Sequence, residues 1–157
     1  MIYDFVIASI GGAIGTALMT GMMLIGKQMG IPAVDAHGIL GYMLNSEKAS
    51  PVGYIMHWIL GVVFAIGYAI VFQYVPRNVI FLGTMLGIIH WIIVGWLFAF
   101  APIAHAGMQA GTVPEPGAYM MKSLGFPGFI AGMVGHIVFG LTVTLVYVWA
   151  GGSLAVA

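Results

Sequence analysis

The chain has 157 residues, of which 62% are hydrophobic and only 5% are charged, with four basic and four acidic side chains. A typical soluble domain carries about 25% charged residues, so this chain cannot build an ordinary water-facing surface. The mean hydropathy of +1.10 agrees, and the sequence therefore indicates an integral membrane protein. The balanced charge, without a basic cluster, argues against nucleic acid as a partner. The absence of cysteine excludes disulfides and thiolate metal sites.

Charged residues and prolines divide the chain into four apolar segments, each long enough for the about 20 residues that cross a bilayer. We expect transmembrane helices near 4–28, 52–75, 78–101 and 127–150. Prolines stand at or beside the proposed ends, where a missing N–H is tolerated: Pro51, Pro76, Pro102 and Pro127.

The connections between these helices differ in length. A tight turn near 75–78 joins the second helix to the third. The connections near 29–51 and 102–126 are long, and in a four-helix arrangement both lie on the opposite side of the membrane. Residues 34–45, VDAHGILGYMLN, are apolar enough to form a short helix at the interface.

Two of the four helices share a pattern centred on a histidine. Residues 53–68 read GYIMHWILGVVFAIGY and residues 132–147 read GMVGHIVFGLTVTLVY, and both fit G-x3-H-x3-G-x6-Y at a spacing of 79 residues. The other two helices and the connections after them share a spacing of 68 residues, at which Gly15 matches Gly83 and His37 matches His105. These matches predict a duplicated helical hairpin.

The expected fold is all-α: a four-transmembrane-helix bundle built from two tandem helical hairpins, in a single membrane domain over 1–157. Repeat 1 covers about 4–75 and repeat 2 about 78–150, related by a pseudo-two-fold axis along the membrane normal. In an up-down bundle the second and fourth helices lie on a diagonal. His57 and His136 are therefore expected to face each other.

Two facing neutral imidazoles suit a transition metal or the two axial positions of a haem iron. Glycines four residues before and after each histidine leave a flat slot: Gly53, Gly61, Gly132 and Gly140. We therefore predict a cofactor between His57 and His136, with haem b favoured over a bare copper, iron or zinc ion. A neighbouring helix backbone could also fill these slots, because small residues spaced four apart let membrane helices pack closely.

Two variants of a metal site are open. In the first, His90 and its repeat counterpart Met22 join His57 and His136 as ligands. The second is a surface site on the long connections, with four candidate ligands: His37, His105, Asp35 and Glu115. For each histidine alone, the ordinary interpretation is a hydrogen bond between helices, which contributes about 0.6–2 kcal/mol.

The stretch 57–76, HWILGVVFAIGYAIVFQYVP, and the later Gly135-His136 pair resemble the YagU-like group of small bacterial inner-membrane proteins. The opening GGAIGTALMTGMMLIGKQMGIPAVD is similar to the start of related four-helix proteins. The resemblance covers most of the chain and implies a multi-pass protein of the bacterial inner (cytoplasmic) membrane with histidines at positions such as 57 and 136. It implies no particular chemistry.

The leading hypothesis is a non-enzymatic membrane subunit that holds this cofactor, for electron transfer or as an accessory or anchor subunit of a larger membrane complex. No span carries a pair of carboxylates or a nucleophile with a base, which argues against an enzyme. One alternative is a transporter or channel for a small solute or metal ion, lined by His57, His90, His136 and Met22. The other is a purely structural subunit. The expected partners are the lipid bilayer and either further copies of the chain, in a homo-oligomer, or other subunits.

Overall fold

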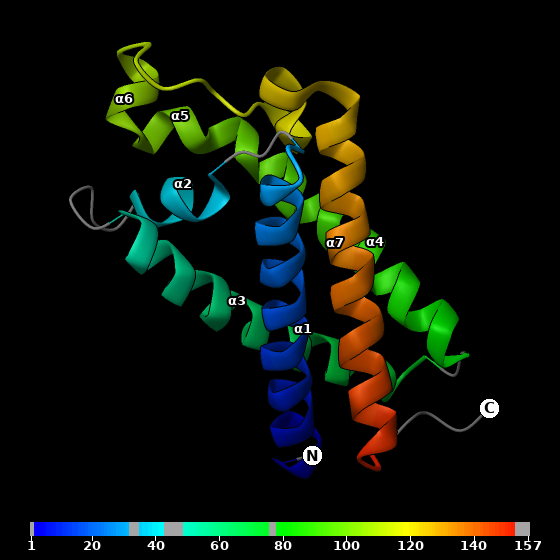
Figure 1. Cartoon of the computed structure of the whole chain (residues 1–157). Helices are drawn as coiled ribbons and strands as arrows, with labels where there is room; N and C mark the ends of the chain where they lie inside the picture. The colour runs from blue at the N-terminus through cyan, green and yellow to red at the C-terminus, as the bar shows by residue number, and fades with distance from the viewer. Residues whose placement is uncertain (1, 32–34, 43–48, 76–77, 153–157) are drawn as a thin grey trace. The chain divides into compact units, whose positions relative to one another are not determined.

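The computed structural model describes residues 2–31, 35–42, 49–75 and 78–152, and all regular secondary structure within these ranges is helical. Figure 1 labels the helices in chain order: α1 (Ile2–Gln28), α2 (Ala36–Tyr42), α3 (Ala49–Phe72), α4 (Val79–Leu97), α5 (Ala101–Ala104), α6 (Ala106–Gln109) and α7 (Met121–Trp149). Short 3-10 turns precede α5 and α7, at Phe98–Phe100 and Ala118–Met120.

Four stretches are long and apolar enough to cross a membrane: Ile2–Gln28, Pro51–Phe72, Val79–Ala104 and Ala118–Trp149. The prediction of an all-α chain with four such helices is therefore confirmed, while the tandem duplication stays a prediction. The bounds differ from the expected ones by a few residues, and two of the differences arise because proline is tolerated in a first helical turn. α3 already begins before Pro51, and the third apolar stretch continues past Pro102, which lies at the start of α5.

The entry into α7 has an unusual backbone. Tyr119 and Met120 both have positive φ angles, of 54° and 58°, a conformation that costs a non-glycine residue on the order of 1 kcal/mol or more. Aromatic contacts hold Tyr119 there, with its ring 5.9 Å from that of Trp91 and 5.5 Å from that of Phe129. Gly125, with φ 63°, then breaks α7, so the regular helix starts close to Pro127, as the sequence predicts.

The connections agree in part with the predictions. The short helix expected within 34–45 is α2. The turn expected near 75–78 lies partly outside the described residues. After it, the Asn78 side-chain oxygen accepts a hydrogen bond from the Ile80 N–H at 2.9 Å, and a side-chain cap of this kind favours helix initiation.

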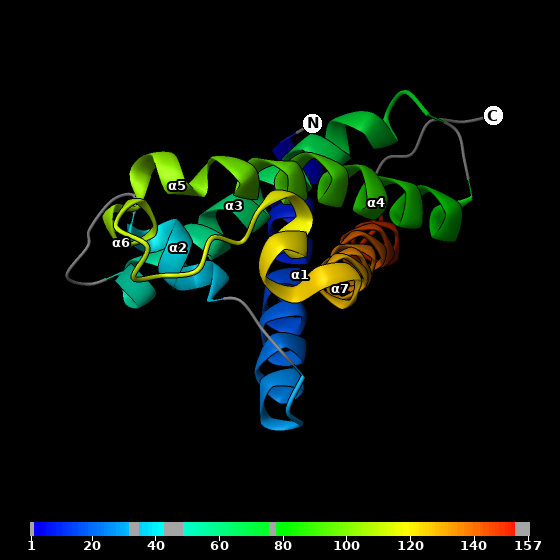
Figure 2. The same cartoon turned by 90° about the horizontal axis from the view of Figure 1, so that it is seen from above.

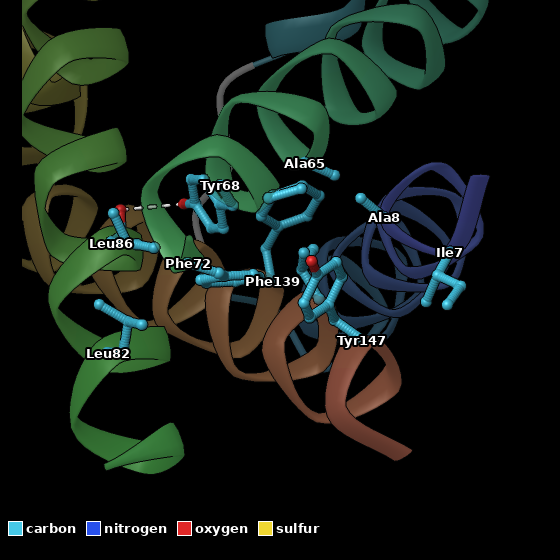
Figure 3. Packing of buried hydrophobic residues seen from close by; sticks show 11 residues of the cluster. Ile7, Ala8, Ala65, Tyr68, Phe72, Leu82, Leu86, Phe139 and Tyr147 are labelled. Atoms are coloured by element: carbon cyan, nitrogen blue, oxygen red, sulfur yellow. Dashed lines mark hydrogen bonds between the residues drawn. The ribbon is translucent and has the colours of Figure 1, made fainter. Parts of the chain in front are cut away.

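The chain divides into two compact units, and the first consists of Met1–Met22, Trp58–Ile89 and Gly135–Ala157. Figure 3 shows its core, in which aromatic rings of α3 meet those of α7. The Tyr68 and Phe139 ring centroids lie 5.9 Å apart, and those of Phe72 and Tyr147 lie 4.8 Å apart. The Tyr68 hydroxyl donates a hydrogen bond to the Leu86 carbonyl oxygen at 2.9 Å, which joins α3 to α4.

Glycine faces bring the helices of the first unit close together. A methyl group on Gly12 of α1 would lie 2.8 Å from the Gly61 carbonyl oxygen of α3. On α4, a methyl group on Gly87 would lie 2.5 Å from the His136 carbonyl oxygen of α7. Real Cβ atoms do not approach this closely, so glycine is what permits both helix pairs to pack at this distance.

The second unit consists of Met23–His57 and His90–Val134. Within it, α2 lies beside α6 in both views (Figures 1 and 2). Ile39 of α2 shares a small apolar cluster with Ala101 of α5 and Met108 of α6. Burial of this face holds α2 in place, because a seven-residue helix is too short to be stable alone.

Candidate histidine site

All five histidines lie within the described residues, and four of them are buried: His37, His90, His105 and His136. His57 is half-buried. His57 and His90 belong to the second compact unit, whereas His136 and Met22 belong to the first. The cofactor site between His57 and His136, with or without His90 and Met22, therefore stays a prediction.

The second unit contains a pair of histidines in direct contact. The Nε2 atom of His37, on α2, lies 3.1 Å from the Nδ1 atom of His57, on α3, within hydrogen-bond distance. The two ring centroids are 4.9 Å apart and the ring planes are inclined by 67°. The rings thus meet through their nitrogen atoms rather than by stacking.

Two residues of α3 position His37. The Tyr54 ring stacks on the His37 ring, with 4.0 Å between centroids and 16° between planes. Gly53 allows the backbone of α2 to come close, because a methyl group at this position would overlap the His37 carbonyl oxygen. The orientation of the His37 ring therefore depends on both α2 and α3.

Asp35 lies at the beginning of α2, and its Oδ1 atom accepts a hydrogen bond from the Gly38 N–H at 2.8 Å. This bond satisfies one of the free N–H groups of the first helical turn. Burial lowers the pKa of the His37 imidazole, and the negative charge of Asp35 opposes this shift. Because the first effect is the larger one, the net shift of the pKa favours the neutral imidazole.

A second histidine–tyrosine stack lies at the other end of α2. The Tyr42 ring stacks on that of His105, with 3.9 Å between centroids and 12° between planes. The His105 Nδ1 atom is buried and finds no hydrogen-bond partner among the described residues. The His37 ring thus packs against His57 and Tyr54, while the His105 ring packs against Tyr42.

The observed positions of the four candidate ligands give little support to the surface metal site predicted on the long connections. Asp35 caps α2, and Glu115 forms an ion pair with Lys122. Within residues 2–31, 35–42, 49–75 and 78–152, no three histidine, aspartate or glutamate side chains gather as a metal site. A site made of His37, His105, Asp35 and Glu115 stays a prediction.

Protein atoms occupy the space beside all four glycines that flank His57 and His136. A methyl group there would overlap a neighbouring group in each case: the His37 carbonyl at Gly53, the Thr16 hydroxyl at Gly61, the Trp91 ring at Gly132 and the Gly83 carbonyl at Gly140. The glycine pattern allows either a slot for a cofactor or the close approach of a neighbouring backbone or side chain. In the structure these four glycines let neighbouring parts of the chain approach closely.

Sequence reasoning missed the contact between His37 and His57 and both tyrosine stacks. One local signal for Tyr54 exists, because it precedes His57 by three residues and so shares its face of α3. The contact itself has no local signal, because it arises from the docking of α2 on α3.

Comparison with protein-family models, with curated protein sequences and with solved structures gave no match. The resemblance to the YagU-like group, and the bacterial inner membrane that it implies, therefore stay predictions. Function has to be inferred from the residues of the chain itself.

Proposed function

We propose that this chain is a non-enzymatic subunit of a membrane assembly, in which buried polar side chains join the helices and the outer apolar faces contact lipid and a second copy of the chain. The observation that carries the proposal is the reversed distribution of polarity. Asp4 of α1 is buried and accepts a hydrogen bond from the Tyr147 hydroxyl of α7 at 2.7 Å, and the Thr16 and Thr144 side chains are buried as well. Large apolar side chains are about half exposed on each of the four long helices: Ile10, Ile59, Ile93 and Leu145.

Water would make this surface unfavourable, since exposed apolar area costs about 25 cal/mol per Å² relative to burial. In a bilayer the same side chains face an apolar medium at no such cost. On α3, Trp58, Ile59, Val62 and Val63 line a shallow depression that is almost entirely apolar. Acyl chains of lipid fit such a surface.

Association between copies is supported by one face of α1. Ala17 is exposed, and a methyl group on Gly21, four residues later, would meet nothing within 4 Å among the described residues. Small residues at this spacing let two membrane helices pack closely. In a symmetric dimer the same face serves both partners, so we propose that α1 packs against α1 of a second copy.

We also propose that the two hairpins are tandem repeats. Gly61 and Gly140 occupy the same position in the histidine pattern, and each packs against the first helix of its own hairpin. Gly61 meets Thr16 on α1, while Gly140 meets Gly83 on α4. Gly83 corresponds to Gly15 at the spacing of 68 residues, so the two contacts occupy nearly equivalent places.

Native mass spectrometry of the full chain, purified in a mild detergent, tests the assembly. The proposal expects a dimer or a larger oligomer of the wild-type chain. Gly21→Ile is expected to lower the oligomer fraction at a given protein concentration. Gly67→Ile is the matched control, since Gly67 on α3 also has open space beside it. A wild-type chain that is monomeric at every concentration contradicts the proposal, and equal effects of the two substitutions contradict the α1 contact.

The same preparation tests the haem prediction. Because protein atoms occupy the glycine slots beside His57 and His136, the proposal expects no Soret absorption after expression with ample haem. A Soret band that is lost in His57→Ala and His136→Ala would instead favour the cofactor-holding subunit.

A further inference from the structure

We propose that His37 and His57 together form a binding site for one divalent transition-metal ion of the zinc or copper class. The sequence placed these histidines in two separate candidate sites. In the structure one nitrogen of each approaches the other, from α2 and from α3. This site goes beyond the proposed assembly function and does not depend on it.

The distance between the two nitrogens fits a shared ion. Zinc–imidazole bonds are about 2.0–2.1 Å long, which places two nitrogens of a tetrahedral site about 3.3 Å apart. The His37 Nε2 and His57 Nδ1 atoms are 3.1 Å apart. To admit the ion, the rings separate by a few tenths of an ångström and turn until both lone pairs point at it. The proton of the hydrogen bond moves to the other nitrogen of the ring that carries it, so that both facing nitrogens can bind.

The charge near the pair also favours a cation. The Asp35 carboxylate acts electrostatically on His37 from the start of the same short helix. A negative charge beside neutral imidazole ligands stabilises a divalent ion that has lost part of its hydration shell.

The first histidine is held in a defined orientation. Tyr54 fixes the plane of the His37 ring by stacking, and Gly53 holds the His37 backbone against α3. Ligands that are oriented before the ion arrives lose less conformational freedom on binding. The pair is therefore better prepared to bind a metal than two histidines on mobile loops.

The ligand set also indicates which ions bind. Imidazole nitrogen suits zinc, copper and nickel, whereas magnesium and calcium require oxygen ligands. No third histidine, aspartate or glutamate side chain joins the pair among the described residues.

Isothermal titration calorimetry with Zn²⁺ tests the site. The full chain is first freed of metal with a chelator and reconstituted in nanodiscs of neutral lipid. We expect one ion per chain and no binding of Mg²⁺. His37→Gln and His57→Gln keep a hydrogen-bonding side chain but lose the imidazole. Each is expected to weaken binding by at least about 100-fold, since even the loss of an outer-shell partner costs about 10–100-fold.

His105→Gln is the matched control, because His105 is a buried histidine of the same unit that stacks on Tyr42. The affinity of the His105→Gln chain for Zn²⁺ should equal that of the wild-type chain. Absence of Zn²⁺ binding to the wild-type chain, or equal loss in all three variants, overturns the proposal. In the first case the pair is a hydrogen bond between α2 and α3 only.

Cu²⁺ provides a direct readout of the ligands. Pulsed electron paramagnetic resonance of the chain with one equivalent of Cu²⁺ should detect the remote nitrogens of two imidazoles, and of one in each glutamine variant. A wild-type spectrum without imidazole nitrogen overturns the proposal.

A third variant keeps both histidines and so remains informative if the glutamine variants fold poorly. Gly53→Ala pushes the His37 backbone away from α3 and should weaken Zn²⁺ binding by about tenfold, as expected for a supporting residue. Gly67→Ala, at a glycine with open space beside it, should leave binding unchanged. Unchanged binding in Gly53→Ala contradicts the α2–α3 geometry of the site.

Discussion

At the scale of single residues, the effect of a glycine depends on the atoms opposite it. Gly140 of α7 faces backbone atoms of Gly83 and Gly87 on α4, whereas Gly67 of α3 has open space beside it. Both lie within long helices, where glycine is a weaker helix former than alanine by about 1 kcal/mol. The same substitution should therefore have opposite effects at the two positions.

Gly140→Ala should lower the free energy of unfolding by about 1–3 kcal/mol, the usual cost of overpacking, because backbone atoms cannot move aside as a flexible side chain can. Reversible unfolding in mixed detergent micelles, followed by circular dichroism, measures the change. Gly67→Ala is the control and should be neutral or stabilising by up to about 1 kcal/mol. Similar losses in both variants would show that α4 and α7 do not pack through Gly140.

A buried hydrogen bond gives a second prediction at this scale. The Tyr147 hydroxyl donates to the Asp4 Oδ1 atom at 2.7 Å, and both residues are buried. Tyr147→Phe removes this donor from a buried carboxylate and should cost about 1–3 kcal/mol of unfolding free energy. The exposed Tyr3 hydroxyl donates to the Ala150 carbonyl oxygen at 2.9 Å, so Tyr3→Phe should cost no more than about 0.5 kcal/mol. An equal effect in the same unfolding assay would contradict this difference.

At the scale of elements, α2 is the helix that depends most on its surroundings. It has seven residues, while isolated helices shorter than about 12 residues are marginal in water. It is held by the Asp35 cap, by Ile39 in the apolar cluster with α5 and α6, and by the two ring stacks of His37 and Tyr42. Weakening one of these contacts should therefore loosen the whole helix.

Asp35→Ala removes the cap on the Gly38 N–H and should cost about 1 kcal/mol. Hydrogen exchange at the amides of α2 should become about fivefold faster, which corresponds to that free energy, while exchange in α3 stays unchanged. Asp35→Asn is the control because asparagine caps as well as aspartate. Faster exchange in both variants would assign the effect to the lost charge rather than to the cap.

At the scale of the whole molecule, the structure has four helices that are long and apolar enough to cross a bilayer, and four crossings would place the connections on defined sides of it. The chain has no cysteine, so single cysteines can report this topology without a background signal. Met29→Cys and Ala110→Cys should react with a membrane-impermeant maleimide from one side of sealed vesicles. Tyr74→Cys and Trp149→Cys should react from the other side. All four positions are exposed, and labelling of all four from one side would contradict four crossings.

The four long apolar helices were predictable because they have the length that a bilayer crossing requires, and because charges and prolines mark where such helices end. The third apolar stretch continues to Ala104 because Pro102 fits the first turn of α5, which the proline alone does not reveal. The break at Gly125 and the positive φ angles of Tyr119 and Met120 depend on packing against Trp91 and Phe129. No local pattern predicts them.

The candidate site was predictable only as separate residues. His37 and His57 are both histidines in apolar sequence surroundings, but the symmetry between the predicted repeats pairs His37 with His105 and His57 with His136. Their contact requires α2 to dock on α3 at Gly53. The sequence pattern places Gly53 in a cofactor slot, because a small residue indicates space without indicating what fills it.

The Trp91 side chain that fills the space beside Gly132 also gives the protein an optical label. Trp91 is 1% exposed, while Trp58, Trp96 and Trp149 are exposed. Brominated lipids quench indole fluorescence on contact, so they should quench the three outer tryptophans and spare Trp91. With Phe in place of those three, the emission of one indole would report whether the second unit is folded, in a native bilayer and in real time.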